Sequence, residues 1–461
     1  MVAISQIINN GLLLTSQSVF QDVATPHQAS TEQYNLVKYL GGAGPYIQHP
    51  GFGISTDIPD QCKLEQIHLL SRHGERYPSK NKGKEFEELY QKFQNYGKPF
   101  VGELAFLNSY EYFVTDKNYY EKETTPFNSE GPYAGTTDAL SHGAAFRSKY
   151  SDVFDSEDKL TVFTSNSGRC HVTARYFARG FLGDDFNDEK VDFAVIAEED
   201  KFGANSLTPV VSCKNYHSGA NNEFVKQFDT SYLSAAAARI TKGNDGFSLS
   251  EKEVDRLIAW CAYEINAKGY SPFCNLFTND ELVRNSYASD LSYYYSNGPG
   301  NNLTATIGAP FLKATLDYLK EENPPQKVVL AFTHDTNIEQ FHSALGIVAP
   351  DQPLPNDYIP FPVPYAHTQI VPMGARLYTE KYKCGNDSYV RYVVNDAVVP
   401  IKHCQNGPGF SCKLSDYENY INSRLEGKDY ATQCGAQNVP DKLTFLWDYN
   451  QTNYSAPDID S

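Results

Sequence analysis

Positive charge and methionine are scarce in this chain of 461 residues. It has 39 lysines and arginines against 56 aspartates and glutamates, a formal net charge of −17, and only 2 methionines. A nucleic-acid or anionic membrane partner would require a basic patch or stripe, so this balance argues against both. No run approaches the roughly 20 apolar residues of a membrane span, and we therefore expect a soluble protein.

Patterns that bind metals or nucleotides are also missing from the sequence. There is no Cys-x-x-Cys pair, no His-x-x-His spacing and no carboxylate cluster, so we expect neither a metal nor a cofactor. Gly41-Gly42-Ala43-Gly44 lacks the Lys-Ser/Thr of a phosphate-binding loop and indicates a flexible turn. Residues 1–24 lack a basic start and a long apolar stretch, so they do not form a convincing signal peptide.

What the chain does contain is cysteine, nine residues in all, and four Asn-x-Ser/Thr acceptor sites. Together they predict a secreted glycoprotein of the extracellular or cell-wall space, rather than a cytosolic protein with scattered thiols. The acceptor sites are Asn302, Asn386, Asn450 and Asn453. Close spacing of Cys261 with Cys274 and of Cys404 with Cys412 indicates small closed loops, although spacing leaves the connectivity open. Because nine is odd, one thiol should be free.

A strand, a polar turn and a helical pattern recur along the chain. Apolar, β-branched runs predict strands at Leu64–Leu70, Leu160–Thr164, Val191–Ala197 and Val328–Thr333. Helical patterns follow two of them, at Val172–Phe181 and Asn337–Leu345. This alternation predicts an α/β fold with a mostly parallel sheet. Ala375–Lys383 and Tyr389–Val394 predict an antiparallel hairpin.

The middle of the chain is mostly helical in pattern. Ser250 with Glu253 and Thr278 with Glu281 form two capping boxes, each of which indicates the start of a helix. We therefore expect a smaller helical domain, residues 85–156 and 220–322, inserted in two pieces into an α/β catalytic domain. The catalytic domain would comprise residues 30–84, 157–219 and 323–461.

Charged side chains follow three of the predicted strands. They are Arg72, His73, Arg76, Arg169, His334 and Asp335. In open α/β sheets the ligand site lies beyond the carboxyl ends of the strands, so these groups should converge. Arginine forks match phosphate oxygens, which predicts an anion site, and in particular a site for a phosphoryl group. Taken singly, each motif is more often a surface loop or salt-bridge site.

The string Arg72–Pro78, Arg-His-Gly-Glu-Arg-Tyr-Pro, is long and unusual, and His334-Asp335 follows far downstream. This combination resembles the histidine acid phosphatases, and in particular their yeast and fungal phytase branch. The resemblance extends from about residue 60 to about residue 440 and includes the setting of Arg169. It implies a phosphoglycerate-mutase-like α/β domain with an inserted, smaller helical domain.

The same resemblance implies a disulfide pattern. Cys62 would pair with Cys384, Cys213 with Cys434, Cys261 with Cys274, and Cys404 with Cys412. Cys170 would be left free, and because it adjoins Arg169 it invites a nucleophilic role. We expect it instead to be a buried structural cysteine, since an acidic environment would keep it a thiol.

The family's mechanism implies a role for each clustered residue. His73 would attack phosphorus and form a phosphohistidine. Arg72, Arg76 and Arg169 should lower the pKa of His73 and, with His334, neutralise the transition state. Asp335 would protonate the leaving alkoxide. Such an acid must start out protonated, which predicts an optimum below pH 6.

Ser79, Lys80, Lys82 and Lys84 follow the motif directly and would meet further phosphates of a polyanionic substrate. Lys82-Gly83-Lys84 is similar to the Lys-Gly-Lys of fungal phytases, which implies phytate as the substrate. A solvated start to a helix at Glu85–Phe93 explains the lysines about equally well. A broad-specificity acid phosphatase therefore remains the close alternative, and Thr336-Asn337 departs from the filamentous-fungal pattern.

Two further functions compete with this hypothesis. One is a cytosolic phosphoryl mutase on the same fold, which the cysteines, the acceptor sites and Asp335 oppose. The other is a non-enzymatic surface glycoprotein whose arginines only bind anions. A homo-oligomer is possible under each of them. His142, His171, His217, His342 and His367 show no partnering pattern, and we expect them to be structural or solvated.

Overall fold

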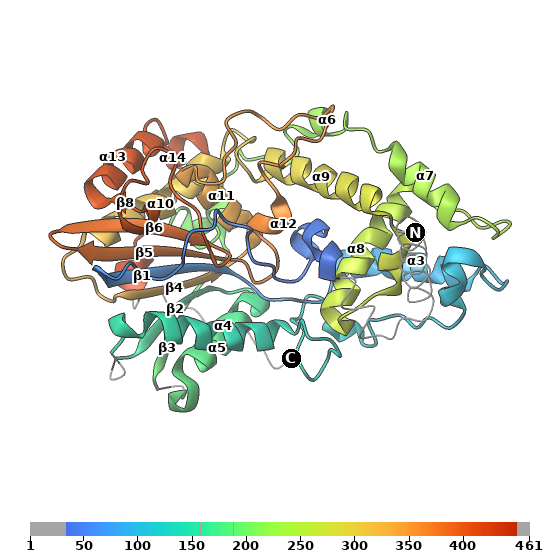
Figure 1. The fold of residues 1–461 in the computed structure, drawn as a ribbon, viewed down its shortest axis with the longest axis horizontal. Coiled ribbons are helices and arrows are strands. Elements are labelled where there is room, and N and C mark those ends of the chain that lie inside the picture. The colour runs from blue at the N-terminus through green and yellow to red at the C-terminus, as the bar shows by residue number, and fades with distance from the viewer. Residues whose placement is uncertain (1–33, 156–157, 188, 450–461) are drawn as a thin grey trace, which may run out of the picture.

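The computed structural model describes residues 34–155, 158–187 and 189–449. One eight-stranded sheet forms its centre, with strand order β3-β2-β4-β1-β5-β6-β7 and with β8 paired to β6 (Figure 1). The strands are β1 Cys62–Arg72, β2 Leu160–Ser165, β3 Val191–Ile196, β4 Val328–Thr333, β5 Arg376–Cys384, β6 Asp387–Val394, β7 Ala397–Val398 and β8 Cys412–Lys413. All four strands expected in the parallel part are present, and so is the hairpin of β5 and β6.

The sheet is mixed, where the sequence predicted one that is mostly parallel. β3, β2, β4 and β1 run parallel to one another. From β5 onward every pairing is antiparallel. For β5 and β6 the cause lies in their connection, which is only Gly385 and Asn386. A turn this short can join only antiparallel strands, whereas parallel neighbours need a long crossover.

Helices cover both faces of the sheet (Figure 1). On one face α4 (Gly135–Tyr150) packs on α5 (Gly168–Leu182), and Phe146 and Phe177 meet strand residues there. The other face carries α10 (Thr304–Lys320), α11 (Asp335–Leu345) and α13 (Leu414–Leu425). Both α5 and α11 begin earlier than predicted. Arg169 and Asp335 therefore lie in first helical turns rather than in loops.

The remaining helices are mostly grouped beside the sheet, around an aromatic core that includes Trp260 and Phe273. Both predicted capping boxes are present, at the starts of α8 and α9. The other α-helices are α3 Lys80–Gln94, α6 Asn222–Val225, α7 Ser231–Ile240, α8 Glu251–Lys268, α9 Asn279–Ser296, α12 His367–Ile370, α14 Tyr430–Gln433 and α15 Phe445–Asp448. The 3-10 helices are η1 Tyr34–Tyr39, η2 Gly41–Ala43, η3 Gly102–Asn108, η4 Lys117–Tyr119, η5 Ser151–Val153, η6 Gly183–Asp185, η7 Asp200–Phe202, η8 Pro209–Ser212, η9 Pro272–Leu276 and η10 Pro408–Phe410.

The division into two discontinuous domains stays a prediction. The packing adds one fact to it, because α4 and α10 fall in the ranges expected for the helical domain yet contact the helices that cover the sheet. α4 contributes Phe146 and Tyr150 to the core beneath the parallel strands. Their burial there favours drawing the boundary before α4 rather than after it.

The four disulfides implied by the family resemblance are all present. Cys62 is bonded to Cys384, and these two residues are also cross-strand partners of β1 and β5. The other three bonds are Cys213–Cys434, Cys261–Cys274 and Cys404–Cys412. Cys170 is free and fully buried, as expected.

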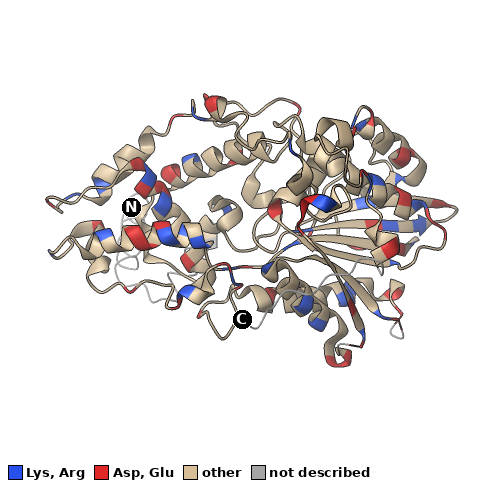
Figure 2. Ribbon diagram, turned by 180° about the vertical axis from the view of Figure 1, so that it is seen from behind, with Lys and Arg blue, Asp and Glu red and all other residues tan. Residues whose placement is uncertain are grey.

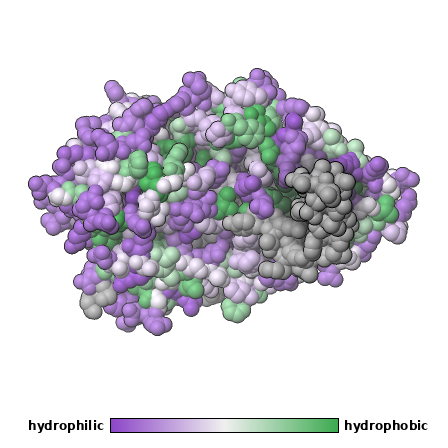
Figure 3. Space-filling model, viewed as in Figure 1, coloured by the Kyte–Doolittle hydropathy of each residue, from purple (hydrophilic) through white to green (hydrophobic). Residues whose placement is uncertain are grey.

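Charges of both signs are interspersed over the fold rather than gathered on one face (Figure 2). Outside the grey atoms, the face in Figure 3 is mainly hydrophilic, with small hydrophobic patches. Within the described part of the chain, no helix is long and apolar enough to cross a membrane. The same residues contain no group of three or more His, Cys, Asp or Glu placed to hold a metal ion.

Candidate active site

The carboxyl ends of three neighbouring strands bring the predicted residues together. β4 lies between β1 and β2 in the sheet. Arg72 ends β1 and His73 follows it, His334 and Asp335 follow β4, and Arg169 lies in the first turn of the helix after β2. The rings of His73 and His334 are 5.8 Å apart between centroids. The rule that ligands bind beyond strand ends therefore locates the cluster correctly.

His73 is the most enclosed member of the cluster, with 1% of its surface exposed. Its Nδ1 lies 2.9 Å from the Gly74 carbonyl oxygen, which accepts the Nδ1 proton and leaves the Nε2 lone pair free. Burial, followed by the charges of Arg72, Arg169, Arg76 and His334, holds the pKa of His73 well below its usual range. Both effects favour the neutral ring, which is the state of a nucleophile.

The backbone beside His73 requires glycine. A Cβ on Gly74 would lie 2.9 Å from the carbonyl oxygen of Gly135, at the start of α4. The N–H of Gly74 is shared between Oε1 of Glu123 at 3.0 Å and Oγ1 of Thr173 at 2.8 Å. Glu123 is 3% exposed, and burial raises its pKa to about 8. A neutral carboxyl group thus fixes the catalytic turn at acid pH.

Arg72 connects three segments of the chain. Its Nη1 donates to the carbonyl oxygens of Gly42 at 2.7 Å and Val371 at 2.6 Å. Its Nη2 lies 2.9 Å from Oδ2 of Asp335. Burial would raise the pKa of Asp335, but Arg72, His367 and His334 together hold it well below its usual range. Asp335 is thus ionised in the free protein, contrary to our expectation of a protonated acid, because the arginine contacts it directly.

His334 is held between groups of opposite charge. Its Nε2 lies 2.6 Å from Oε1 of Glu198, and its Nδ1 lies 3.3 Å from Nη2 of Arg169. Burial alone would lower the pKa of His334, but the Cys170 sulfur at 3.8 Å and the Glu198 carboxylate raise it to about 10. The ring is accordingly a cation at acid and neutral pH.

Glu198, which contacts His334, is a residue of the site that the sequence analysis missed. It follows β3, a strand that was predicted, but no site residue was assigned to the end of that strand. The strand-end rule would have found it. Applied to all four parallel strands, the rule includes Glu198 among the residues beyond their carboxyl ends.

Gly42 and His367 were also missed, and the structure corrects the prediction of a flexible turn at residues 41–44. Gly41 and Gly42 are buried in η2. The N–H of Gly42 donates to Nδ1 of His367 at 3.1 Å, and a Cβ on Gly42 would lie 2.6 Å from that ring. These residues are 325 positions apart, and no periodic pattern in the sequence connects them.

The arginines carry donors suited to an anion. Arg76 donates from Nη1 to the Tyr77 carbonyl oxygen at 2.8 Å, and its guanidinium lies 5.7 Å from the centre of the Tyr263 ring. The Nε atoms of Arg72, Arg76 and Arg169 are buried without a hydrogen-bond partner among the described residues. Buried donors of this kind are typical of a site that a ligand completes.

Ser79 and the three lysines after the motif differ in their exposure and in their contacts. The hydroxyl of Ser79 accepts the N–H of Lys82 at 3.3 Å and caps α3, which begins at Lys80 rather than at the predicted Glu85. Lys80 and Lys84 are exposed. Lys82 lines a cavity of about 380 Å³ that Gly42 and Tyr293 also line, and its Nζ lies 3.0 Å from Oε2 of Glu85. Of the three lysines, only Lys82 therefore lines this cavity. Gly42 lines it as well, and its carbonyl oxygen accepts a hydrogen bond from Arg72.

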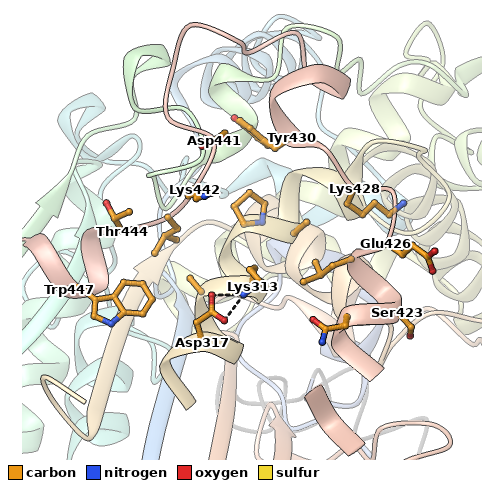
Figure 4. A pocket seen from close by; sticks show the side chains of 16 residues that line it. Lys313, Asp317, Ser423, Glu426, Lys428, Tyr430, Asp441, Lys442, Thr444 and Trp447 are labelled. Carbon is orange, nitrogen blue, oxygen red and sulfur yellow. Dashed lines mark hydrogen bonds and ion pairs between the residues drawn. The ribbon is translucent and has the colours of Figure 1, made fainter. Parts of the chain in front are cut away.

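A separate cavity of about 700 Å³ lies between α10, α13 and the segment that leads into α15 (Figure 4). None of the predicted site residues lines it. Lys313 and Asp317 pair with each other inside it, and Trp447 stands at one end (Figure 4). The catalytic cluster is therefore distinct from this cavity.

The chain belongs to the histidine phosphatase superfamily (branch 2), whose family model matches residues 63–395. The resemblance drawn from the motifs is confirmed. The protein is accordingly an enzyme of the histidine phosphatase class.

Several of its relatives come from yeasts. The chain is 57% identical over 460 residues to a Candida albicans protein named phytase PHO112, with 99% of both chains covered. It is 44% identical over 432 residues to acid phosphatase PHO11 of Saccharomyces cerevisiae, with 92% of both covered. Among solved structures it is similar to the phytase from D. castellii, at a TM-score of 0.91 and 55% identity, covering 96% of this chain and 97% of that one.

Proposed function

We propose that this histidine phosphatase is a secreted acid phosphatase that hydrolyses phytate through a phosphohistidine intermediate. The observation that carries the proposal is the state of His73, which is neutral, buried and free at Nε2 beside three arginines. A neutral imidazole among fixed cations is suited to attack a phosphoryl group. No metal or cofactor takes part in the proposed reaction.

The reaction consists of two displacements. Nε2 of His73 forms a bond to phosphorus, the bond from phosphorus to the ester oxygen breaks, and Asp335 gives its proton to that oxygen as the alcohol leaves. Water then attacks the phosphohistidine, Asp335 takes a proton from the water, and inorganic phosphate is released as the bond to Nε2 breaks. Arg72, Arg76, Arg169 and His334 neutralise the phosphoryl oxygens in both steps.

Asp335 must gain a proton before it can act, although it is ionised in the free protein. Arg72 lies 2.9 Å from this carboxylate and is also the arginine expected to bind the incoming phosphate. A bound dianion would share the charge of Arg72 and repel the carboxylate, so the pKa of Asp335 would rise. Acid pH would supply the proton. The expected optimum below pH 6 therefore still holds, but because Asp335 is protonated after the substrate binds rather than before.

Phytate as the main substrate is supported by Lys82 and by the names of the relatives. Lys82 lines a cavity that Gly42 also lines, and the carbonyl oxygen of Gly42 accepts a hydrogen bond from Arg72 of the cluster, so a second phosphate at Lys82 would lie on the Gly42 side of the site. Ser79, Lys80 and Lys84 contribute less in this proposal, because Ser79 caps a helix and the two lysines are exposed. The relative named as an acid phosphatase keeps broad phosphomonoester hydrolysis as the alternative.

The substrate is tested by measuring kcat/KM on phytate and on an aryl phosphate at pH 4–5. We expect Lys82→Ala to lower kcat/KM for phytate about tenfold, equivalent to about 1.4 kcal/mol, and to leave the aryl phosphate unchanged. Lys117→Ala is the control, because it removes another Lys–Glu pair involving α3, with Glu87. Equal losses on both substrates, or no preference for phytate in the wild type, would support the broad acid phosphatase.

Secretion, glycosylation and self-association belong to the same proposal. Asn302 and Asn386 are exposed, so a glycan at either would meet no steric obstacle from its own surroundings. Asn450 and Asn453 lie outside the described residues. Endoglycosidase treatment of protein secreted from a yeast host should lower its apparent mass, and light scattering after treatment measures its oligomeric state.

A further inference from the structure

Glu198 is the carboxylate that touches His334 most closely. Its Oε1 lies 2.6 Å from Nε2 of His334, and the side chains are 29% and 13% exposed respectively. The backbone N–H of Glu198 donates to Oδ1 of Asn166, beyond the end of β2, at 3.0 Å. Two strand ends thus fix Glu198 beside the ring.

We propose that Glu198 is a positioning residue that keeps His334 doubly protonated, so that its Nδ1–H faces the phosphoryl group together with Arg169. The proposal rests on the phosphatase function proposed above and deepens it. Glu198 does not touch the substrate in this account. It acts through the ring, by accepting the Nε2 proton and stabilising the charge that the phosphate oxygens meet.

Of the other groups around the ring, only the Cys170 sulfur favours the charged form, and it lies 3.8 Å from the ring nitrogens against 2.6 Å for Glu198. Arg169 at 3.3 Å from Nδ1 and His73 at 5.8 Å between ring centroids both oppose a positive ring. Asp335 follows His334 in the chain, but its carboxylate is engaged by Arg72 at 2.9 Å. The thiol of Cys170 donates to the Thr333 carbonyl oxygen at 3.3 Å and lies 3.8 Å from both ring nitrogens.

Glu198 is itself ionised. Burial raises its pKa, but His334, Ser165 and Arg169 outweigh burial and lower it below the usual range. When Nδ1 also carries a proton, Nδ1–H and the Arg169 guanidinium are two donors 3.3 Å apart that cannot bond to each other. An anion between them satisfies both. The geometry therefore matches a phosphate oxygen at this point.

The role predicts a dependence on pH that a merely structural role would not show. Without the Glu198 carboxylate, burial and Arg169 oppose charge on His334, so the ring would be charged only in acid, at most up to the ordinary histidine pKa of about 6.5, and neutral at pH 7.5. Loss of the carboxylate should consequently matter little in strong acid and more as the pH rises. Glu198 would extend the working range of the enzyme toward neutrality.

The test compares Glu198→Gln with Glu199→Gln on an aryl phosphate between pH 4 and pH 7.5. Glu199 is its neighbour in sequence, is half exposed, and pairs with Lys201 at 2.8 Å on the surface, so it is a matched control. We expect Glu198→Gln to retain kcat/KM within about fivefold at pH 4. Above the lowered pKa of His334 in this variant, kcat/KM should fall about tenfold more for each pH unit. Glu199→Gln should follow the wild type throughout.

Either no loss in Glu198→Gln or a loss that is constant across pH would overturn the proposal. If Glu198→Gln fails to fold, histidine NMR of the wild type decides, with the His334 signal assigned by comparison with His334→Ala. A ring charged through pH 8 is expected, and a titration near pH 6.5 would contradict the role. Absence of any hydrolysis by the wild type would instead contradict the proposed function.

Discussion

Two sets of carboxyl groups surround the catalytic cluster, and they differ in charge. The front carboxyls, Asp335 and Glu198, each lie within 2.9 Å of a cationic side chain, which holds their pKa low despite burial. The rear carboxyls, Glu75, Glu123 and Glu339, are at most 3% exposed. None of the three pairs with an arginine or lysine among the described residues, and burial raises the pKa of each.

The comparison teaches that contact with a cation, rather than burial, decides which acids are charged here. The front carboxyls order the groups that meet phosphate. The rear carboxyls work as neutral hydrogen-bonding groups, such as Glu75, whose Oε1 accepts the Tyr46 N–H at 2.7 Å. An enzyme arranged in this way is matched to acid, because acid leaves the front charged and the rear neutral in the free enzyme and supplies the proton that Asp335 takes up once phosphate shares Arg72.

The largest expected effect comes from neutralising a front carboxyl. Asp335→Asn removes the proposed acid and keeps the shape of the side chain. We expect kcat for an alkyl phosphate to fall by about a hundredfold to ten-thousandfold, the usual contribution of a general acid. An aryl phosphate, whose leaving group needs no proton, should lose far less. Equal losses on both substrates would contradict the assignment of Asp335.

The rear carboxyls should make the wild type less stable as the pH rises. Burial raises the pKa of Glu123, a rear carboxyl, to about 8, and two carboxyls outside that set behave alike, since burial raises the pKa of Asp290 to about 8 and that of Glu264 to about 7. The folded state therefore holds protons that the unfolded chain has lost above its ordinary carboxyl pKa of about 4. Their contribution to the unfolding free energy is full below that value and declines until the pH passes about 8. The front carboxyls, with lowered pKa, oppose this trend only in stronger acid.

Thermal unfolding between pH 5 and pH 8 at constant ionic strength measures this loss. We expect Tm to fall steadily over that interval. The unfolding free energy should fall by several kcal/mol in sum, at about 1.4 kcal/mol for each pKa unit that separates the folded from the unfolded state. A Tm that stays level or rises toward pH 8 would show that the rear carboxyls are not protonated in the folded state.

The smallest effect is expected when a rear carboxyl is replaced by its neutral amide. Glu123→Gln should retain activity within about threefold at pH 4.5, because the amide oxygen can still accept the N–H of Gly74. Glu123→Ala is the matched comparison. It leaves that N–H with Thr173 alone and should cost about 1–3 kcal/mol of unfolding free energy. If Gln destabilised as much as Ala at pH 4.5, Glu123 would be ionised and the two sets would not differ.

The sequence predicted the parallel strands and the six charged residues at their ends, because apolar runs and strand-end chemistry are both local signals. The same rule, applied to β3, would have added Glu198. It could not give Glu123, which lies 49 residues from Gly74, or His367, which meets Gly42 across 325 residues. These contacts are made by packing alone. The ionised state of Asp335 likewise depends on a contact with Arg72 that spacing does not encode.

The central claim is that His73 carries the phosphoryl group during turnover. Rapid alkaline quenching of the wild type during hydrolysis of an aryl phosphate preserves a phosphohistidine, and mass spectrometry then locates it. We predict one added phosphoryl group on the peptide that contains His73, absent from His73→Ala. No phosphoryl group on that peptide during active turnover, or one on Cys170 instead, would contradict the account.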